Sequence, residues 1–175
     1  MGDREDIEAI FREYVFGFIF HDIEREIWLA KKAEHDALHS VYPGPHPGGG
    51  NLLAALGLLA YTEFLGTFVT GKSRGESANF NAVLALMPPC YAAFDAKLAT
   101  DPTQKGIYHT FRNGMAHEYA VKRDCDIFML NGRETCGIGE DDDRYYFVVE
   151  RYFQDFCAAA NRVYQQLLKN PILPK

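Results

Sequence analysis

The sequence predicts a mainly α-helical fold with a small antiparallel β-meander before its last helix. Apolar residues recur every three or four positions through most of the chain, and this spacing gives way to strand-like segments only after His117. The 175 residues are 47% hydrophobic and 14% aromatic, which is enough apolar material for one full core. We therefore expect residues 1–175 to form a single helical domain.

Residues 3–38 have the pattern of a long amphipathic helix, and Gly17 inside it is a point where this helix can break once. Residues 42–50 are rich in proline and glycine, which predicts a loop between two parts of one bundle. The apolar positions expected to face the core are Ile7, Ile10, Tyr14, Phe18, Ile23, Ile27 and Ala30.

A second helix is expected over Leu52–Thr70, with Asn51 as its cap and Gly71 as its end. Its largely apolar residues approach the length of a membrane span. Glu63 in its second half, and glycines suited to close packing, favour a buried central helix and no membrane association. A buried Glu63 needs a partner, and Arg112 is the candidate.

The segment Gly66–Ser73 matches the phosphate-loop pattern G-x4-G-K-S. A phosphate loop follows a buried strand and opens a helix. Here the residues before Gly66 have a helical pattern and those after Ser73 indicate a turn, so we interpret the match as coincidental.

Two shorter helices are expected over residues 79–87 and 90–99, separated by Pro88-Pro89. Asp101-Pro102 then predicts the cap and first turn of the next helix. The apolar side chains expected to face the core from the two shorter helices are Phe80, Val83, Leu84, Tyr91 and Phe94.

Strand signals follow. Residues 126–130 and 133–138 flank Asn131-Gly132, which predicts a tight hairpin, and residues 144–150 predict a third strand after an acidic turn over 139–143. Pro171 ends a final helix, whose expected core residues are Phe153, Phe156, Ala160, Val163 and Leu167.

Composition limits the class of protein. The net charge is −6, yet residues 105–123 contain four basic side chains against one acidic, so a basic spot lies on an acidic body. No cysteine pair or histidine spacing indicates a zinc site or a disulfide framework, and no metal or other cofactor is expected. The N-terminus lacks the pattern of a signal peptide, which favours a cytoplasmic location. The cysteines, expected to be reduced and mostly buried, are Cys90, Cys125, Cys136 and Cys157.

The stretch Ile107–Tyr119 contains the residues most suited to chemistry. At helical spacing, Tyr108, Phe111 and Met115 form an apolar stripe, and a second, polar stripe consists of His109, Asn113 and His117. In a regular α-helix, Arg112 and His117 are roughly 140° apart and about 7.5 Å apart along the axis. The reach of arginine, a loosened turn at Gly114 or a second copy of the helix could bring them together.

Arg112-Asn113-x-x-x-His117-x-Tyr119 resembles the Arg-x4-His-x-Tyr signature of HEPN domains, and the order of elements over residues 51–169 is also similar. The resemblance implies a HEPN-like helical bundle, usually a homodimer, that in many members is a metal-independent endoribonuclease of toxin or defence type and in others only binds. In HEPN toxins paired with a small nucleotidyltransferase antitoxin, that partner adds adenylyl groups to the motif tyrosine, to which Tyr119 corresponds.

The residues suggest two hypotheses. In the first, RNA is the substrate: His117 removes the proton of a ribose 2′-hydroxyl, Arg112 stabilises the charge on the phosphate, and Asn113, Tyr119 and Glu63 support binding and orientation. A two-fold partner supplies a second His117, and His109 lies outside the motif. In the second, the chain is a non-catalytic binding or dimerisation module in which Arg112 and Glu63 form a structural ion pair and His117 donates a hydrogen bond to a carbonyl at a helix end.

Overall fold

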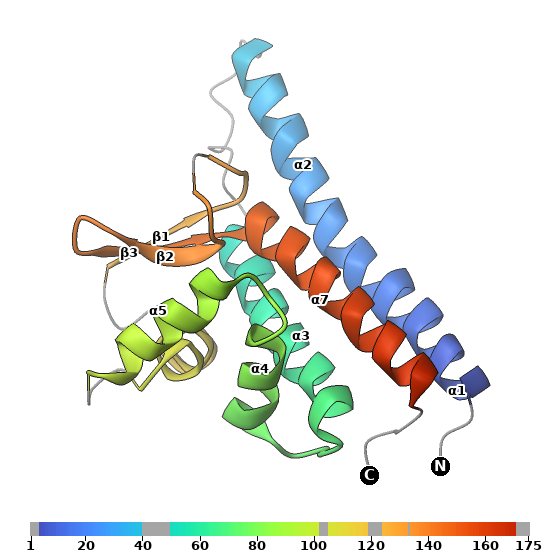
Figure 1. The fold of residues 1–175 in the computed structure, drawn as a ribbon. Coiled ribbons are helices and arrows are strands. Elements are labelled where there is room, and N and C mark those ends of the chain that lie inside the picture. Colours follow the sequence, from blue (N-terminus) through green and yellow to red (C-terminus); the bar gives the residue numbers. More distant parts are fainter. Residues whose placement is uncertain (1–3, 40–49, 102–104, 119–123, 133, 171–175) are drawn as a thin grey trace.

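The computed structural model describes residues 4–39, 50–101, 105–118, 124–132 and 134–170. Long helices pack around α3, and a three-stranded sheet lies immediately before the last helix, α7 (Figure 1). The predicted fold class, a mainly helical protein with a small sheet before its last helix, is confirmed.

One uninterrupted helical region spans α1 (Arg4–Ile10), η1 (Phe11–Ile19) and α2 (Phe20–His39), so Gly17 does not break it. The central segment η1 is a π-helix, whose turns are wider than those of an α-helix. In an α-helix, residues four apart drift about 40° around the axis at each step. The wide turns reduce this drift and keep a run at four-residue spacing facing the core; this run is Ile7, Phe11, Val15, Ile19, Ile23 and Ile27.

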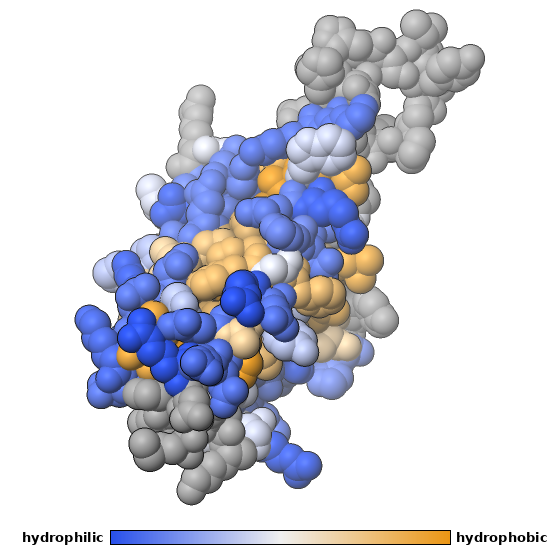
Figure 2. All heavy atoms as spheres, turned by 90° about the vertical axis from the view of Figure 1, so that its right-hand side faces the viewer, coloured by the Kyte–Doolittle hydropathy of each residue, from blue (hydrophilic) through white to orange (hydrophobic). Residues whose placement is uncertain are grey.

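Two residues of the predicted apolar stripe lie on the wrong side. Tyr14 and Phe18 are 60% and 59% exposed, because the π-helical segment turns them outwards and Phe11, Val15 and Ile19 inwards. Trp28 and Leu29, further along α2, are also exposed. Figure 2 views the right-hand side of Figure 1 and shows apolar side chains within a largely hydrophilic surface.

Helix α3 (Asn51–Thr70) is the central helix of the bundle and packs against α4 (Glu76–Leu84) and α7 (Val149–Lys169). Gly71, at φ 70°, ends α3 as predicted. Asn51 does not cap the helix; its amide donates instead to the Ile127 carbonyl at 2.7 Å. By length and composition alone α3 could cross a membrane, but Leu58, Leu59 and Leu65 are buried within the protein.

Gly66 lies where α3 and α4 approach most tightly, since a Cβ atom there would be 2.0 Å from the carbonyl oxygen of Asn79. Because Gly66 is inside α3 and α4 begins only at Glu76, the G-x4-G-K-S match has neither the strand before it nor the helix start after it that a phosphate loop requires.

Helices α4 and α5 (Pro89–Ala99) flank Pro88 as predicted, and the five apolar residues assigned to their core side are all buried. The prediction of a helix start at Asp101-Pro102 is wrong, although Pro102 itself lies outside the described residues. The next helical segment, η2, begins at Tyr108, after Lys105 and Gly106 have turned the chain with positive φ values. Asp95 of α5 accepts the Ile107 N–H at 2.7 Å and so anchors this start.

The sheet has the strand order β1-β3-β2, formed by β1 (Cys125–Phe128), β2 (Ile138–Asp141) and β3 (Arg144–Val148). β2 and β3 are antiparallel, whereas β1 pairs with β3 in parallel. The predicted hairpin across Asn131-Gly132 is therefore wrong. The tight turn lies instead at Asp142-Asp143, where both residues have positive φ, as a two-residue hairpin turn of matching twist requires.

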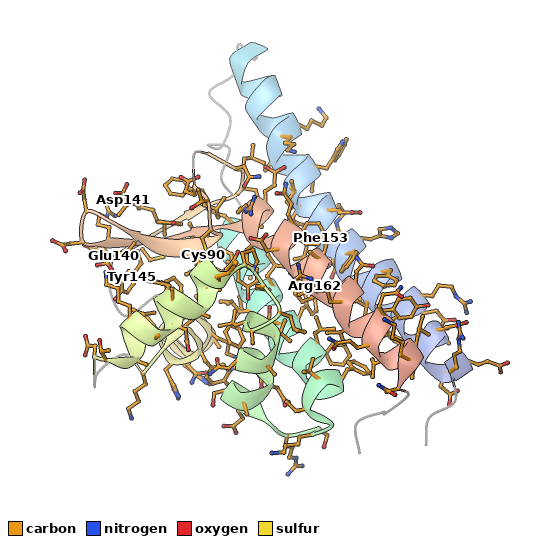
Figure 3. All side chains as sticks on the ribbon, viewed as in Figure 1. Cys90, Glu140, Asp141, Tyr145, Phe153 and Arg162 are labelled. Carbon is orange, nitrogen blue, oxygen red and sulfur yellow. A yellow bond between two sulfur atoms is a disulfide. The ribbon has the colours of Figure 1, made fainter. Side chains whose placement is uncertain are left out.

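The expectation of four reduced thiols is also corrected. Cys90, at the start of α5, and Cys136 form a disulfide across a sequence separation of 46 residues, with their Cα atoms 6.2 Å apart (Figure 3). Tyr91 of α5 adds a link to the same segment before β2 and another to α7, because its hydroxyl accepts the Gly137 N–H at 2.9 Å and donates to Asp155 at 2.8 Å. The two remaining cysteines, Cys125 and Cys157, are free and partly buried, and burial raises the pKa of each to about 12.

Candidate functional site

The residues singled out in the sequence lie on η2 (Tyr108–Asn113) and α6 (Gly114–Glu118). The three apolar residues of this region, Tyr108, Phe111 and Met115, are buried as predicted and fix the helix against the core. A loosened turn at Gly114 is one of the three ways in which Arg112 and His117 could be brought together. The wider helical geometry lies instead in the preceding π-helical segment, and Gly114 begins the regular α-helix. Arg112 is thus in the last part of the π-helix, and His117 is in the α-helix that follows.

Arg112 and Glu63 form the predicted ion pair, with the guanidinium Nε 2.9 Å from the carboxylate Oε2. The two side chains are only 24% and 22% exposed, so the contact is well shielded from water. The buried Nε–H is not aimed along a hydrogen bond to any described acceptor, so we interpret this contact as a charge pair and not as an aligned hydrogen bond.

Tyr108 contacts both members of this ion pair. The motif spacing did not predict this contact, because the position of Tyr108 in the apolar stripe indicated only a core residue. Its hydroxyl donates to Glu63 at 3.5 Å, and the Arg112 Cζ lies 5.6 Å from the centre of its ring. Burial raises the pKa of Tyr108, which the nearby arginine lowers in part and Glu63 raises further. The phenol is therefore neutral near pH 7, and its ring flanks the cation.

On the other side, Arg112 Nη1 donates to the side-chain oxygen Oδ1 of Asn113 at 3.3 Å, and the side-chain nitrogen Nδ2 of Asn113 is 3.4 Å from Nδ1 of His109. His109, outside the motif, is thus part of the polar network. We call Glu63, Tyr108, His109, Arg112 and Asn113 the Arg112 cluster. Four of these residues are on one helical segment, and Glu63 is contributed by the central helix α3.

His117 stands apart from this cluster. It is exposed on α6 and makes no hydrogen bond or ion pair with any residue that the structure describes. Its imidazole is open to solvent and available to a ligand. Tyr119, the last residue of the motif, lies outside the described residues.

The Arg112 cluster can present part of a fixed positive charge to an anion. Its guanidinium is held by Glu63 at Nε and by Asn113 at Nη1, whereas Nη2 makes no hydrogen bond to the described part of the chain. A planar guanidinium with a free donor is suited to a phosphate oxygen.

No protein-family model, curated protein or solved structure shows significant similarity to this chain.

Proposed function

We propose that the chain is a HEPN-like RNA-binding protein that cleaves RNA without a metal ion, with Arg112 and His117 as its catalytic residues. The observation that carries the proposal is the solvent-exposed imidazole of His117, on the helical turn after a guanidinium that Glu63 and Asn113 already hold in place. An imidazole, which can accept and donate a proton, and a guanidinium, which can bind phosphate oxygens, together suit reaction at a phosphodiester.

In the proposed reaction, His117 accepts the proton of a ribose 2′-hydroxyl as the 2′-oxygen attacks the adjacent phosphorus. Arg112 stabilises the negative charge that gathers on the non-bridging oxygens. The bond from phosphorus to the 5′-oxygen breaks, leaving a 2′,3′-cyclic phosphate on one fragment and a 5′-hydroxyl on the other. Asn113 and Tyr119 would contact the phosphate or a base, and Glu63 would orient Arg112.

The leaving 5′-oxygen needs a proton from the side opposite the attacking oxygen. One imidazole does not reach both positions, so we propose a homodimer in which the His117 of a second copy is the acid. By the same resemblance, the protein would act in the cytoplasm as a toxin or defence factor, and a nucleotidyltransferase-type partner would neutralise it by modifying Tyr119.

A second candidate function, a non-catalytic binding or dimerisation module, is favoured by one contact. Arg112 is largely shielded and already paired with Glu63, as in a structural ion pair. In this case the Arg112 cluster would only fix η2 to α3, and His117 would be an ordinary surface residue.

Cleavage of RNA separates the two candidates. Cellular RNA is incubated in a chelating buffer with wild type, Arg112→Ala, His117→Ala and, as a matched control, His21→Ala, which replaces another exposed histidine on α2. New 2′,3′-cyclic phosphate ends are then counted. Loss of a catalytic base costs about 10²- to 10⁴-fold in rate. We expect such a loss for His117→Ala and only a small change for His21→Ala. Equal cleavage by wild type and His117→Ala, or none by either, contradicts the enzyme and favours the module.

A further inference from the structure

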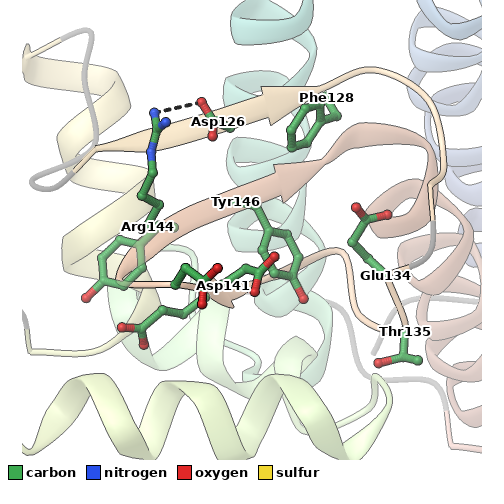
Figure 4. Close-up of a pocket in the computed structure, with 10 residues that line it drawn as sticks. Asp126, Phe128, Glu134, Thr135, Asp141, Arg144 and Tyr146 are labelled. Atoms are coloured by element: carbon green, nitrogen blue, oxygen red, sulfur yellow. Dashed lines mark hydrogen bonds and ion pairs between the residues drawn. The ribbon is translucent and has the colours of Figure 1, made fainter.

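The sheet has an outer face that the described helices do not cover. Side chains alternate along β3, so Tyr145 and Phe147 point into the core and are buried, while Arg144 and Tyr146 point outwards. The strand register places Asp126 of β1 beside Tyr146. These outward side chains and the segment before β2 line a hollow of about 540 Å³ (Figure 4).

The floor of this hollow is aromatic. Phe128 is 47% exposed and is one of the residues that line the hollow. Tyr146 lies across Gly139, where a Cβ atom would come within 2.3 Å of the tyrosine hydroxyl. Glycine at this position therefore allows the Tyr146 ring to lie along the sheet surface beside the hollow.

The walls are acidic, with five carboxylates against the single guanidinium of Arg144 among the lining residues. Asp126 is paired with Arg144 at 3.0 Å, and Glu140 is paired with Lys97. Asp141 and Asp142 are exposed and form no ion pair or hydrogen bond with the described chain. Glu134 accepts the Gly132 N–H at 3.0 Å but meets no described cation. Within the described ranges, three carboxylates around an exposed aromatic floor thus have no cationic partner.

The placement of these carboxylates indicates which kind of cation fits. No three acidic, histidine or cysteine side chains of the described residues converge as metal ligands. The acids are spread around the hollow, so one small ion cannot neutralise them all. Several lysine or arginine side chains on one segment can, because their long stems cover apolar surface such as Phe128 while their charged ends reach carboxylates and aromatic rings.

We propose that the outer face of the sheet docks a lysine- or arginine-rich segment of a partner protein. Charge complementarity requires a positively charged partner. The exposed ring of Phe128 supplies apolar area for the aliphatic stems of the partner's lysine or arginine side chains. This surface consists of the sheet and its adjoining loop and uses no residue of the Arg112 cluster. The inference therefore stands whether or not the protein cleaves RNA.

The test uses a fluorescent peptide of alternating arginine and glycine, with a serine-glycine peptide and spermidine as comparisons. Fluorescence anisotropy is measured on the full chain, in low salt and near 0.15 M salt. Asp141→Asn/Asp142→Asn removes two charges, and asparagine tolerates the positive φ of Asp142. The matched control, Glu5→Gln/Asp6→Asn, removes two charges from exposed positions of α1.

We expect the arginine peptide to bind, and the turn variant and Phe128→Ala each to weaken it about tenfold or more. The α1 control should retain wild-type affinity, and thermal unfolding should verify that each variant is folded. Equal weakening by the two double variants would mean that only net charge attracts the peptide and would overturn the proposal. Absence of binding by the arginine peptide, or binding of spermidine as tight as that of the peptide, would overturn it as well.

Discussion

Replacing Glu63 with glutamine should destabilise the protein, because the change leaves the shielded guanidinium of Arg112 without its carboxylate. Exposed ion pairs contribute about 0–1 kcal/mol, whereas breaking a fully buried pair costs about 3–5 kcal/mol. Both side chains here are about one quarter exposed, so we expect an intermediate loss of about 1–3 kcal/mol. For a chain of this length, that loss lowers Tm by about 3–9 °C.

The assay is urea and thermal unfolding of a double-mutant cycle made of Glu63→Gln, Arg112→Gln and the double variant. A coupling free energy of about 1 kcal/mol or more is expected between residues in direct contact. Glu8→Gln is the matched control, since Glu8 pairs with Arg4 at a similar distance, 2.8 Å, but at exposed positions. It should cost less than about 0.5 kcal/mol.

Two results would refute this reasoning. If Glu63→Gln costs no more than Glu8→Gln, burial does not strengthen the contact. If the effects of Glu63→Gln and Arg112→Gln add to within about 0.5 kcal/mol, the two groups do not interact in solution. RNA cleavage by the folded Glu63→Gln variant then separates the two roles of Glu63: an orienting role predicts a slower reaction, and a purely structural role predicts an unchanged rate.

Three further changes test the packing and the charges. Gly66→Ala should destabilise the protein by about 1–3 kcal/mol or more in urea unfolding, because the added Cβ meets a backbone carbonyl of α4. Gly57→Ala, on the same helix, has room for the Cβ and should stabilise the protein by about 0.5–1 kcal/mol. Equal effects of the two substitutions would contradict the close approach of α3 and α4. Removing the Cys90–Cys136 disulfide, which closes a loop of 46 residues, should cost about 2–4 kcal/mol, and wild type in reducing buffer should match the double serine variant. Burial raises the pKa of Glu150, but hydrogen bonds from the Asn131 N–H and from Lys31 lower it overall. The carboxylate therefore stabilises the folded protein above the unfolded pKa of about 4.3, and this stabilisation is lost as the pH falls. Glu150→Gln should accordingly be less stable than wild type near pH 7 and equally stable in acid.

Local signals in the sequence were sufficient for most helices. Gly71 ends α3, and Pro88 and Pro89 are the N-cap and the first residue of α5, because the positive φ of the glycine and the fixed φ of proline act within one or two residues. The core side of α7 also followed from spacing alone, since a regular α-helix repeats every 3.6 residues. The same argument failed for Tyr14 and Phe18, because the spacing of apolar residues does not indicate where a helix widens into a π-helix.

Pairing between distant segments was harder to predict. Asn131-Gly132 is a good hairpin turn locally, but β1 pairs with β3 in parallel, and the side chain of Asn51 in α3 donates a hydrogen bond to the Ile127 carbonyl of the same strand. The Cys90–Cys136 disulfide likewise depends on where α5 meets the segment before β2, which no cysteine spacing encodes.

The sequence by itself determined the helical class, the helix bearing Arg112 and His117, and the need of Glu63 for a cationic partner, because periodicity and the cost of burying a charge are local or general rules. Only the tertiary structure decided that Tyr108, His109 and Asn113 surround that arginine, that His117 faces solvent, and that the sheet leaves an acidic, aromatic face open. These features depend on the angle and depth at which separate elements pack, and packing is set by the fit of the whole core and not by any one segment.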